Sequence, residues 1–277
     1  MVTELTVVSW NVLAAPWAAP EYYPAAMDPA LLDRVARRER VAARLAELDA
    51  DVVCLQETTP VDLMAIVAAL GPAYSAHSAP NGRDLWTDWA TDALPWESNG
   101  TAILWRTDRL AQPTTDALAL SDDGNVATTL AVRVGGVDLH VVSAHLDVDR
   151  PDLRRAQLRV ACGAVATGGA AVVAGDCNED TAGTDLGAIA AEHDFIDALT
   201  AVGDADPTHP LARPSDDFAP LARLDHVLVR GAGPVAARVV DAGLFAIDDA
   251  EARWIECLRR TGSDHLAVET RIALSPS

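Results

Sequence analysis

The sequence predicts an α+β protein in which helices and strands follow one another and part of the sheet is antiparallel. One observation is a helical pattern at 31–48 that leads directly into an apolar strand at 51–57, as in helices packed on a sheet. The other is a pair of β-branched segments, 128–134 and 137–144, separated by a Gly-Gly dipeptide that is typical of a hairpin. Both helical layers and antiparallel pairing are therefore expected.

The remaining elements follow in chain order. Alternating apolar residues at 5–13 predict a first strand, and the proline- and alanine-rich stretch 14–29 predicts a long excursion after it. The stretch between 229 and 266 gives no clear pattern. Further helices are expected at 60–70 and 151–165, and further strands at 101–105, 170–174, 224–229 and 266–272.

The chain has 277 residues without internal repeats or a linker of distinct composition, so we expect residues 1–277 to form a single domain. Half of the residues are hydrophobic, which excludes a disordered chain. The four cysteines form no CxxC pair, so neither a zinc ribbon nor a thioredoxin-like motif is expected. With no leader-like N-terminus and no apolar run of about 18 residues, we expect a cytoplasmic protein without a membrane anchor.

The charge of the chain limits its partners. All 21 basic residues are arginine, and the formal net charge is −20. Affinity for long nucleic acids rests largely on basic residues that displace counterions, so a broad nucleic-acid surface is not expected. A metal ion and a few arginines can still position one phosphate. No protein partner is required by the pattern.

Polar residues gather where the apolar segments end or, for the cluster at 223–226, where one begins. If these ends converge, several carboxylates and two histidines share one pocket, and such carboxylates repel unless a cation relieves them. Oxygen ligands favour Mg²⁺ or Mn²⁺ over Zn²⁺, so the pattern predicts a divalent-metal site suited to phosphate hydrolysis. The clusters are Ser9-Trp10-Asn11, Gln56-Glu57, Ser98-Asn99-Gly100, Ala144-His145-Leu146, Gly175-Asp176-Cys177-Asn178, Arg223-Leu224-Asp225-His226 and Ser263-Asp264-His265.

The motifs SWNVLA, CLQE, SNGTAILWR, SAHLD, GDCNED, LDHVLV and SDHLAV, in this order, resemble the endonuclease/exonuclease/phosphatase superfamily. Its members include deoxyribonuclease I, abasic-site endonucleases, sphingomyelinases, inositol-phosphate phosphatases and RNA deadenylases. The resemblance runs from Ser9 to Val268. It implies a four-layer α/β/β/α sandwich of two packed mixed sheets flanked by helices, with the site at one edge of the sheets. It also implies metal-assisted in-line attack of water on a phosphodiester or phosphomonoester.

The resemblance implies which residues surround the metal. Glu57 would be the principal ligand, with Asn11 close to the metal or its bound phosphate. Asp264 would complete the metal environment. The implied ion is Mg²⁺, with Mn²⁺ as an alternative.

The resemblance also implies the catalytic roles. Asp176 would orient or deprotonate the attacking water, and Asn178 would hold that water or the scissile phosphate. His265, oriented by Asp225, would stabilise charge in the transition state. His145 would contact the phosphate from the opposite side.

The substrate is specified less sharply. The SWNVLA start and the segment HLDVDRPDLRRAQL resemble the deadenylase and 2′-phosphodiesterase branch, which favours RNA or nucleotide ends. Asn99, Arg150 and Arg154 are candidate substrate contacts, although helix solvation explains the arginines as well. Three tryptophans in one polar loop could stack on bases, insert into a membrane surface, or pack on the core. These are Trp86, Trp89 and Trp96.

Three alternatives stay open beside the RNA or nucleotide reading: a phospholipid or inositol-phosphate hydrolase of the sphingomyelinase kind, a DNA-repair endonuclease, and a catalytically silent binding module. The complete set of motifs argues against the last. Among the other histidines, His140 and His226 are expected to be structural. His209 is expected in a loop, with a place in the cleft as the less favoured alternative.

Overall fold

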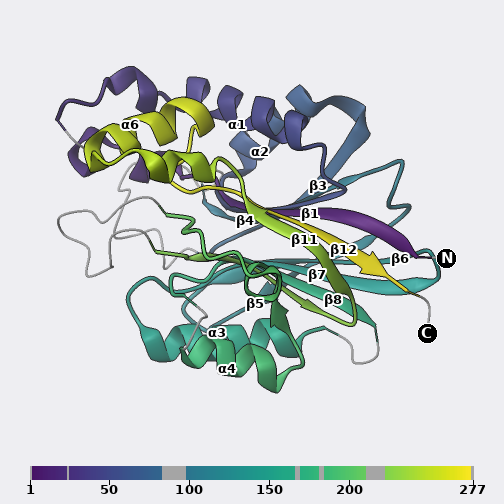
Figure 1. Ribbon diagram of the computed structural model, residues 1–277. Helices are drawn as coiled ribbons and strands as arrows, with labels where there is room; N and C mark the ends of the chain where they lie inside the picture. The colour runs from purple at the N-terminus through teal and green to yellow at the C-terminus, as the bar shows by residue number, and fades with distance from the viewer. Residues whose placement is uncertain are drawn as a thin grey trace.

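A computed structural model describes residues 2–23, 25–82, 98–165, 169–180, 184–209 and 222–275. Within this part of the chain the strands form two six-stranded sheets that pack face to face, with helices on the outer face of each (Figure 1). The four-layer α/β/β/α sandwich is therefore confirmed. No helix of the described residues is long and apolar enough to cross a membrane.

The first sheet has the order β11-β12-β1-β2-β4-β3, and α1, α2 and α6 cover it (Figure 1). Its strands β1 and β2 are parallel, and the other neighbours are antiparallel. The strands are β1 (Thr3–Asn11), β2 (Val52–Thr58), β3 (Tyr74–Pro80), β4 (Gly100–Arg106), β11 (Gly233–Val239) and β12 (Val268–Leu274). The helices are α1 (Arg34–Leu48), α2 (Pro60–Leu70) and α6 (Ala250–Thr261).

The second sheet has the order β5-β6-β7-β8-β10-β9, and α3 and α4 cover it (Figure 1). Here β7 and β8 are the parallel pair. The strands are β5 (Thr114–Ala119), β6 (Val126–Val134), β7 (Val137–His145), β8 (Ala170–Asp176), β9 (Ile196–Asp197) and β10 (Asp225–Arg230). The helices are α3 (Pro151–Gly163), α4 (Asp185–Glu192) and the short α5 (Ala198–Val202), and short 3₁₀ turns include Ala15–Trp17, Pro20–Tyr22, Pro29–Leu32, Gly71–Ala73 and Ala242–Ala246.

The layers follow from the period of two in the central strands. In β1, Val7 belongs to the core between the sheets, whereas its neighbour Val8 packs under the helices of the first sheet. In β8, Val172 faces the same central core and Val173 faces α3 and α4. The burial of each such side chain contributes about 1.5–3 kcal/mol to the stability of the fold. Strands that are apolar on both faces therefore favour a structure in which each sheet is covered on one face by the other sheet and on the other face by helices.

Several predicted elements are confirmed. The helix at 60–70 is α2, and the Gly-Gly hairpin joins β6 and β7. Its two glycines, Gly135 and Gly136, have φ angles of +59° and +87°, which a tight hairpin turn requires. Helix α1 begins later than expected, at Arg34, because the Asp33 carboxylate accepts the Ala36 N–H at 2.8 Å and caps the helix there.

Other elements were not predicted. The unclear stretch 229–266 contains β11 and α6, and the chain between the expected elements also forms β3 and β5. Strand β5 is an edge strand whose side chains are mostly exposed, so no alternation of apolar residues marks it.

The polar ends of four central strands meet at one end of the sandwich. In the parallel pairs, Asn11 lies opposite Gln56 and His145 lies opposite Asp176. Ser143 connects the sheets here, because its hydroxyl donates to the Leu55 carbonyl at 3.1 Å and accepts from Gln56 at 3.2 Å. Each sheet thus contributes polar residues to the same edge.

Gly175 precedes Asp176, and we expect Gly175→Ala to destabilise the protein by about 3 kcal/mol or more. A Cβ at this position would lie 1.8 Å from the Ala144 carbonyl oxygen of the neighbouring strand, so the central pair β7 and β8 would have to separate. Urea denaturation measures the effect. Gly243→Ala is the control, since its Cβ meets nothing within 4 Å, and equal stability of the two variants would contradict the prediction.

Candidate active site

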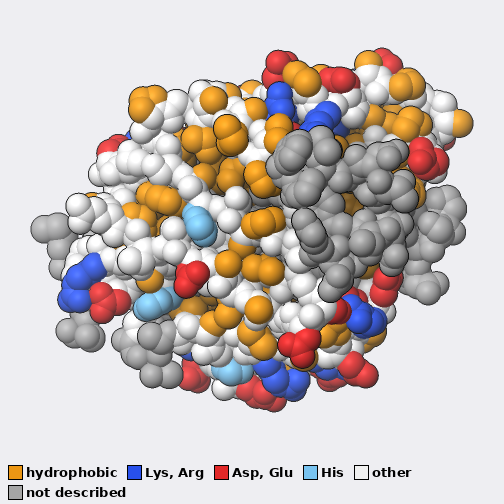
Figure 2. Space-filling view, turned by 180° about the vertical axis from the view of Figure 1, so that it is seen from behind, with side chains coloured by type: hydrophobic (Ala, Val, Ile, Leu, Met, Phe, Trp, Pro, Cys, Tyr) orange, Lys and Arg blue, Asp and Glu red, His pale blue; other side chains and the backbone are white. Residues whose placement is uncertain are grey.

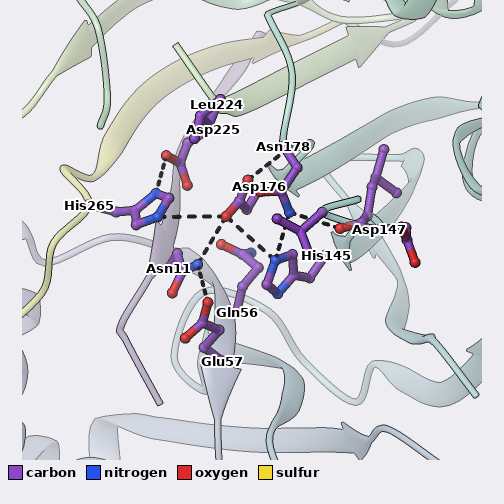
Figure 3. Close-up of polar contacts among 12 residues, drawn as sticks. Asn11, Gln56, Glu57, His145, Asp147, Asp176, Asn178, Leu224, Asp225 and His265 are labelled. Carbon is purple, nitrogen blue, oxygen red and sulfur yellow. Dashed lines mark hydrogen bonds and ion pairs between the residues drawn. The ribbon is translucent and has the colours of Figure 1, made fainter. Parts of the chain in front are cut away.

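Asp176 lies at the centre of the polar edge and is only 2% exposed. Its Oδ2 accepts a hydrogen bond from Asn11 Nδ2 at 3.0 Å and lies 3.6 Å from His145 Nε2 and 3.8 Å from His265 Nε2 (Figure 3). Its Oδ1 accepts the Asn178 N–H at 2.8 Å. Burial acts to raise the pKa of Asp176, but the two histidines and these hydrogen bonds hold it below its ordinary value. Asp176 is therefore favoured in its ionised form, although its carboxylate is buried.

His265 and Asp225 form a buried pair beside Asp176. His265 Nδ1 lies 2.8 Å from Asp225 Oδ2. Although burial opposes it, the charges of Asp225 and Asp176 raise the pKa of His265 to about 10. Burial raises the pKa of Asp225. The hydroxyl of Thr208 accepts the N–H groups of Leu224 and Asp225 at 3.0 Å each and so fixes the start of β10. The two carboxylates thus favour the imidazolium form of His265 at neutral pH.

This pair gives the stability of the metal-free protein a pH dependence. The pKa of His265 is higher in the folded chain, about 10, than its ordinary value of 6.5, so its contribution is complete below pH 6.5. The contribution is lost as the pH rises toward 10. We expect the stability difference between wild type and His265→Gln to shrink over that range, as measured by urea denaturation in chelator. A difference that grows with pH would contradict this assignment.

Glu57 is joined to Asp176 through Asn11. Its Oε1 accepts from Asn11 Nδ2 at 2.9 Å, and its Oε2 accepts the Ala14 N–H at 2.8 Å (Figure 3). Asn11 Oδ1 accepts the Leu13 N–H, so the amide directs its NH₂ group, and not its oxygen, at the two carboxylates. Glu57 has a φ of +57°, a conformation that costs about 1–3 kcal/mol in a residue other than glycine. The bulge at the end of β2 that imposes it turns the carboxylate toward the site.

Asp264 is buried behind this group. Its Oδ2 lies 3.4 Å from the Tyr23 hydroxyl. The buried Arg37 guanidinium lies near the charges of both Asp264 and Glu57 and donates to the carbonyls of Leu13 and Gly262 at 2.9 Å. Arg37 therefore ties the loop after β1 to the loop that carries His265.

Two positions at this edge could hold a metal. One is the group Asp176, Asp225 and His265, and the other is the carboxylate of Glu57. Among the described residues, Asp176, Asp225 and His265 offer ligand atoms that all lie within 4.8 Å of one another. The raised pKa of His265 opposes metal binding there, however, because a cation would have to displace the imidazolium proton. Glu57 offers a half-buried carboxylate that the Asn11 amide joins to Asp176, and such oxygen donors suit a hard divalent cation. The donor chemistry therefore fits a metal at Glu57 better.

Asn178 and His145 form the far side of the site. Asn178 Nδ2 donates to the Leu146 carbonyl at 2.9 Å and lies 3.0 Å from His145 Nε2. Asn178 is buried in a left-handed conformation with a φ of +52°, whereas the His145 side chain is 24% exposed. His145 is therefore the more accessible of the two.

Among the described residues predicted to contact the substrate, only some lie at the polar edge. Asn99 lies at the same sheet edge, because the following Gly100 pairs with Thr58 in β2. Arg150 is exposed and forms ion pairs with Asp147, at 2.7 Å, and with Asp123. Trp86, Trp89 and Trp96 lie outside the described residues.

Arg154 is placed differently from a substrate contact. It is 7% exposed, its Nε lies 3.0 Å from Glu179 Oε2, and it donates to the carbonyls of Asp147 and Val148. Its guanidinium therefore joins two loops of the protein. On the face drawn in Figure 2, the arginines of the described residues lie in small groups beside acidic side chains, as the net charge of −20 leads one to expect.

Sequence reasoning undervalued His209. It is 5% exposed, and its ring centroid lies 4.6 Å from that of His265 at an angle of 60°. Its one signal is its place between Pro207 and Pro210, shortly before the strand that carries Asp225. His226, in contrast, is buried with both ring nitrogens close to protein oxygens, as expected for a structural histidine.

The model of the Endonuclease/Exonuclease/phosphatase family matches residues 8–265. The chain belongs to this family. Its members are hydrolases that act on phosphoester bonds, and the protein is an enzyme of this class. The match includes every residue that the preceding paragraphs place at the polar edge, from Asn11 to His265. Among curated proteins the sequence has no significant match.

Solved structures show the same fold. An endonuclease/exonuclease/phosphatase from Bacteroides vulgatus is 17% identical, with a TM-score of 0.70 over 99% of this chain and 100% of that one. TDP2 of D. rerio, solved with a single-stranded DNA product, is 17% identical, with a TM-score of 0.66 over 98% and 99%. ANGEL2, a 2′,3′-cyclic phosphatase, is 14% identical, with a TM-score of 0.70 over 99% and 96%.

Proposed function

We propose that the chain is a Mg²⁺-dependent phosphoesterase that hydrolyses phosphodiester or phosphomonoester bonds at RNA or nucleotide ends, with Mn²⁺ able to replace Mg²⁺. One observation carries the proposal. The Asn11 amide joins Glu57 to Asp176, and Asp176 in turn faces the imidazoles of His145 and His265 (Figure 3). Side chains suited to bind a cation, to accept a proton and to contact a phosphate thus lie in one polar group.

The metal would be held by Glu57, with Asp264 as the second acidic residue of its environment. When bound, Mg²⁺ would supply Lewis-acid stabilisation of charge on the phosphoryl oxygens. Asn11 would act here as a donor that sets the spacing of Glu57 and Asp176, because its oxygen already accepts from Leu13.

The protein's own groups account for the other roles. Asp176 is charged at neutral pH and would orient the attacking water and accept its proton. His265, held by Asp225, would donate to a phosphoryl oxygen as an imidazolium, and His145 would donate from the exposed side. Asn178 would hold the water or the phosphate, with its backbone fixed by Asp176.

Two considerations favour RNA or nucleotide ends. The SWNVLA and HLDVDRPDLRRAQL segments resemble the deadenylase and 2′-phosphodiesterase branch, and the 2′,3′-cyclic phosphatase ANGEL2 shares the fold. A net charge of −20 also disfavours both long nucleic acids and anionic membranes, since each is held largely by basic residues. Substrates with a single reacting phosphate at a chain end fit this charge best.

A hydrolysis panel tests the proposal. Single-stranded RNA with defined ends, 2′,3′-cyclic nucleotides, single-stranded and abasic DNA, sphingomyelin, inositol phosphates and bis-nitrophenyl phosphate are each incubated with Mg²⁺, Mn²⁺ or chelator. We expect the highest kcat/KM on RNA or nucleotide ends and no turnover in chelator. A preference for DNA or lipid would replace the substrate assignment, and full activity in chelator would refute the metal requirement.

A further inference from the structure

His226 follows Asp225 in β10 but is not part of the cluster around Asp176. Successive side chains of a strand point to opposite faces, so His226 lies on the other face of the second sheet from Asp225. Its side chain is fully buried. A buried imidazole next to a catalytic strand end needs partners for both ring nitrogens.

In the described part of the chain, the oxygens that face the two ring nitrogens of His226 accept hydrogen bonds and cannot donate them. Nδ1 lies 2.8 Å from Asp197 Oδ2, and Nε2 lies 3.1 Å from the Glu179 carbonyl oxygen. A neutral imidazole donates from one nitrogen only, so the two bonds together require the doubly protonated ring. In agreement, hydrogen bonding and charge from Asp197 raise the pKa of His226 against the effect of burial. His226 is therefore a buried cation that donates in two directions.

The Glu179 end of this arrangement reaches the active site. Glu179 follows Asn178, whose left-handed backbone conformation must be held by its surroundings. The Glu179 carboxylate pairs with Arg154 at 3.0 Å, and Arg154 donates to the Asp147 carbonyl at 3.1 Å, two residues after His145. Glu179 thus links two sets of contacts: its backbone carbonyl faces His226 and follows Asn178, and its carboxylate binds Arg154, which reaches the loop after His145.

We propose that His226 is a positioning residue, which holds the Glu179 carbonyl and thereby keeps the Asn178 side chain against His145 and beside Asp176. The inference rests on the proposed function, because it takes Asn178 and His145 to act on the water or the phosphate. Arg154 would help by holding the Glu179 carboxylate against the loop that follows His145.

Two substitutions separate the two bonds of His226. In His226→Gln the side-chain amide reaches about as far as Nε2 and can still donate to Glu179. In His226→Asn the amide reaches only as far as Nδ1, so the bond to Asp197 is kept and the bond to Glu179 is lost. We expect kcat to fall about 10- to 100-fold in His226→Asn with KM within about twofold, and to stay within about threefold of wild type in His226→Gln.

Controls separate positioning from stability and from the proposed function. Both variants remove one buried hydrogen bond, so their thermal midpoints are measured to compare the losses of stability. His140→Asn is the control for the type of substitution, and it should keep full activity. Equal losses of kcat in the Gln and Asn variants, or none in the Asn variant, would overturn the inference. Should wild type cleave no substrate, amide hydrogen exchange at Asn178 still decides: faster exchange in His226→Asn than in His226→Gln supports positioning, and equal exchange refutes it.

Discussion

Asp176→Asn is expected to lower kcat by about 10³- to 10⁴-fold while KM changes little. The substitution keeps the shape of the side chain but removes the charge that lies between His145 and His265 and that would take a proton from water. The loss should appear at every pH between 6 and 9, because the pKa of the wild-type carboxyl lies below its ordinary value and the group is charged throughout that range.

The measurement compares steady-state kinetics of wild type, Asp176→Asn and Asp152→Asn on the best substrate of the panel. Asp152 is the matched control, since its carboxylate on α3 is 99% exposed. The variant should remain folded, because an amide can still accept the Asn178 N–H that the carboxylate accepts now. A variant that is folded and keeps more than about a tenth of the wild-type kcat would exclude Asp176 as the base.

Glu57→Gln is expected to raise the Mg²⁺ concentration for half-maximal activity by about 10²-fold or more. Glutamine can still accept from either Asn11 or Ala14, but it lacks the charge that a hard cation requires. In the absence of metal the variant should differ little from wild type in stability, because the removal of one of several like charges offsets the loss of one of the two hydrogen bonds from Asn11 and Ala14. Mg²⁺ titrations of activity, with thermal unfolding in chelator, measure the two effects.

The other possible metal position, at Asp176, Asp225 and His265, provides the control for the Mg²⁺ titration of Glu57→Gln. Asp225→Asn removes a member of the group Asp176, Asp225 and His265, whose ligand atoms also lie close together. If the metal is held by Glu57, Asp225→Asn should lower kcat with little change in Mg²⁺ affinity. A large loss of affinity in Asp225→Asn together with none in Glu57→Gln would move the metal to that group.

The sequence predicts the strands that carry the site better than the contacts within it. Strand ends at Asn11, Glu57 and Asp176 could be located because buried strands are continuous apolar runs and the polar residue after each run is conspicuous. That these ends come from two different sheets follows only from the order of the family's motifs. Periodicity describes each strand alone and does not say which sheet it joins.

Side-chain partners were the least predictable feature. Arg154 lies on an amphipathic helix where a solvated arginine is the simplest expectation, yet it is buried because the Glu179 carboxylate and two backbone carbonyls lie in a different part of the chain. His209 is similar, since its tilted ring contact with His265 depends on how a loop returns to the sheet. Contacts of this kind come from the tertiary fold and leave no local pattern in the sequence.

The division of the polar edge between the two sheets links catalysis to the docking of the whole sandwich. Asn11 and Glu57 belong to one sheet, Asp176 and His145 belong to the other, and the Ser143 hydroxyl connects the two. A chain whose sheets had formed but slid apart by even a fraction of a strand spacing would retain most of its secondary structure and lose its reaction. Enzymatic turnover is therefore a sensitive reporter of native sheet packing, and it should vanish earlier during gradual denaturation than the circular dichroism of the strands and helices.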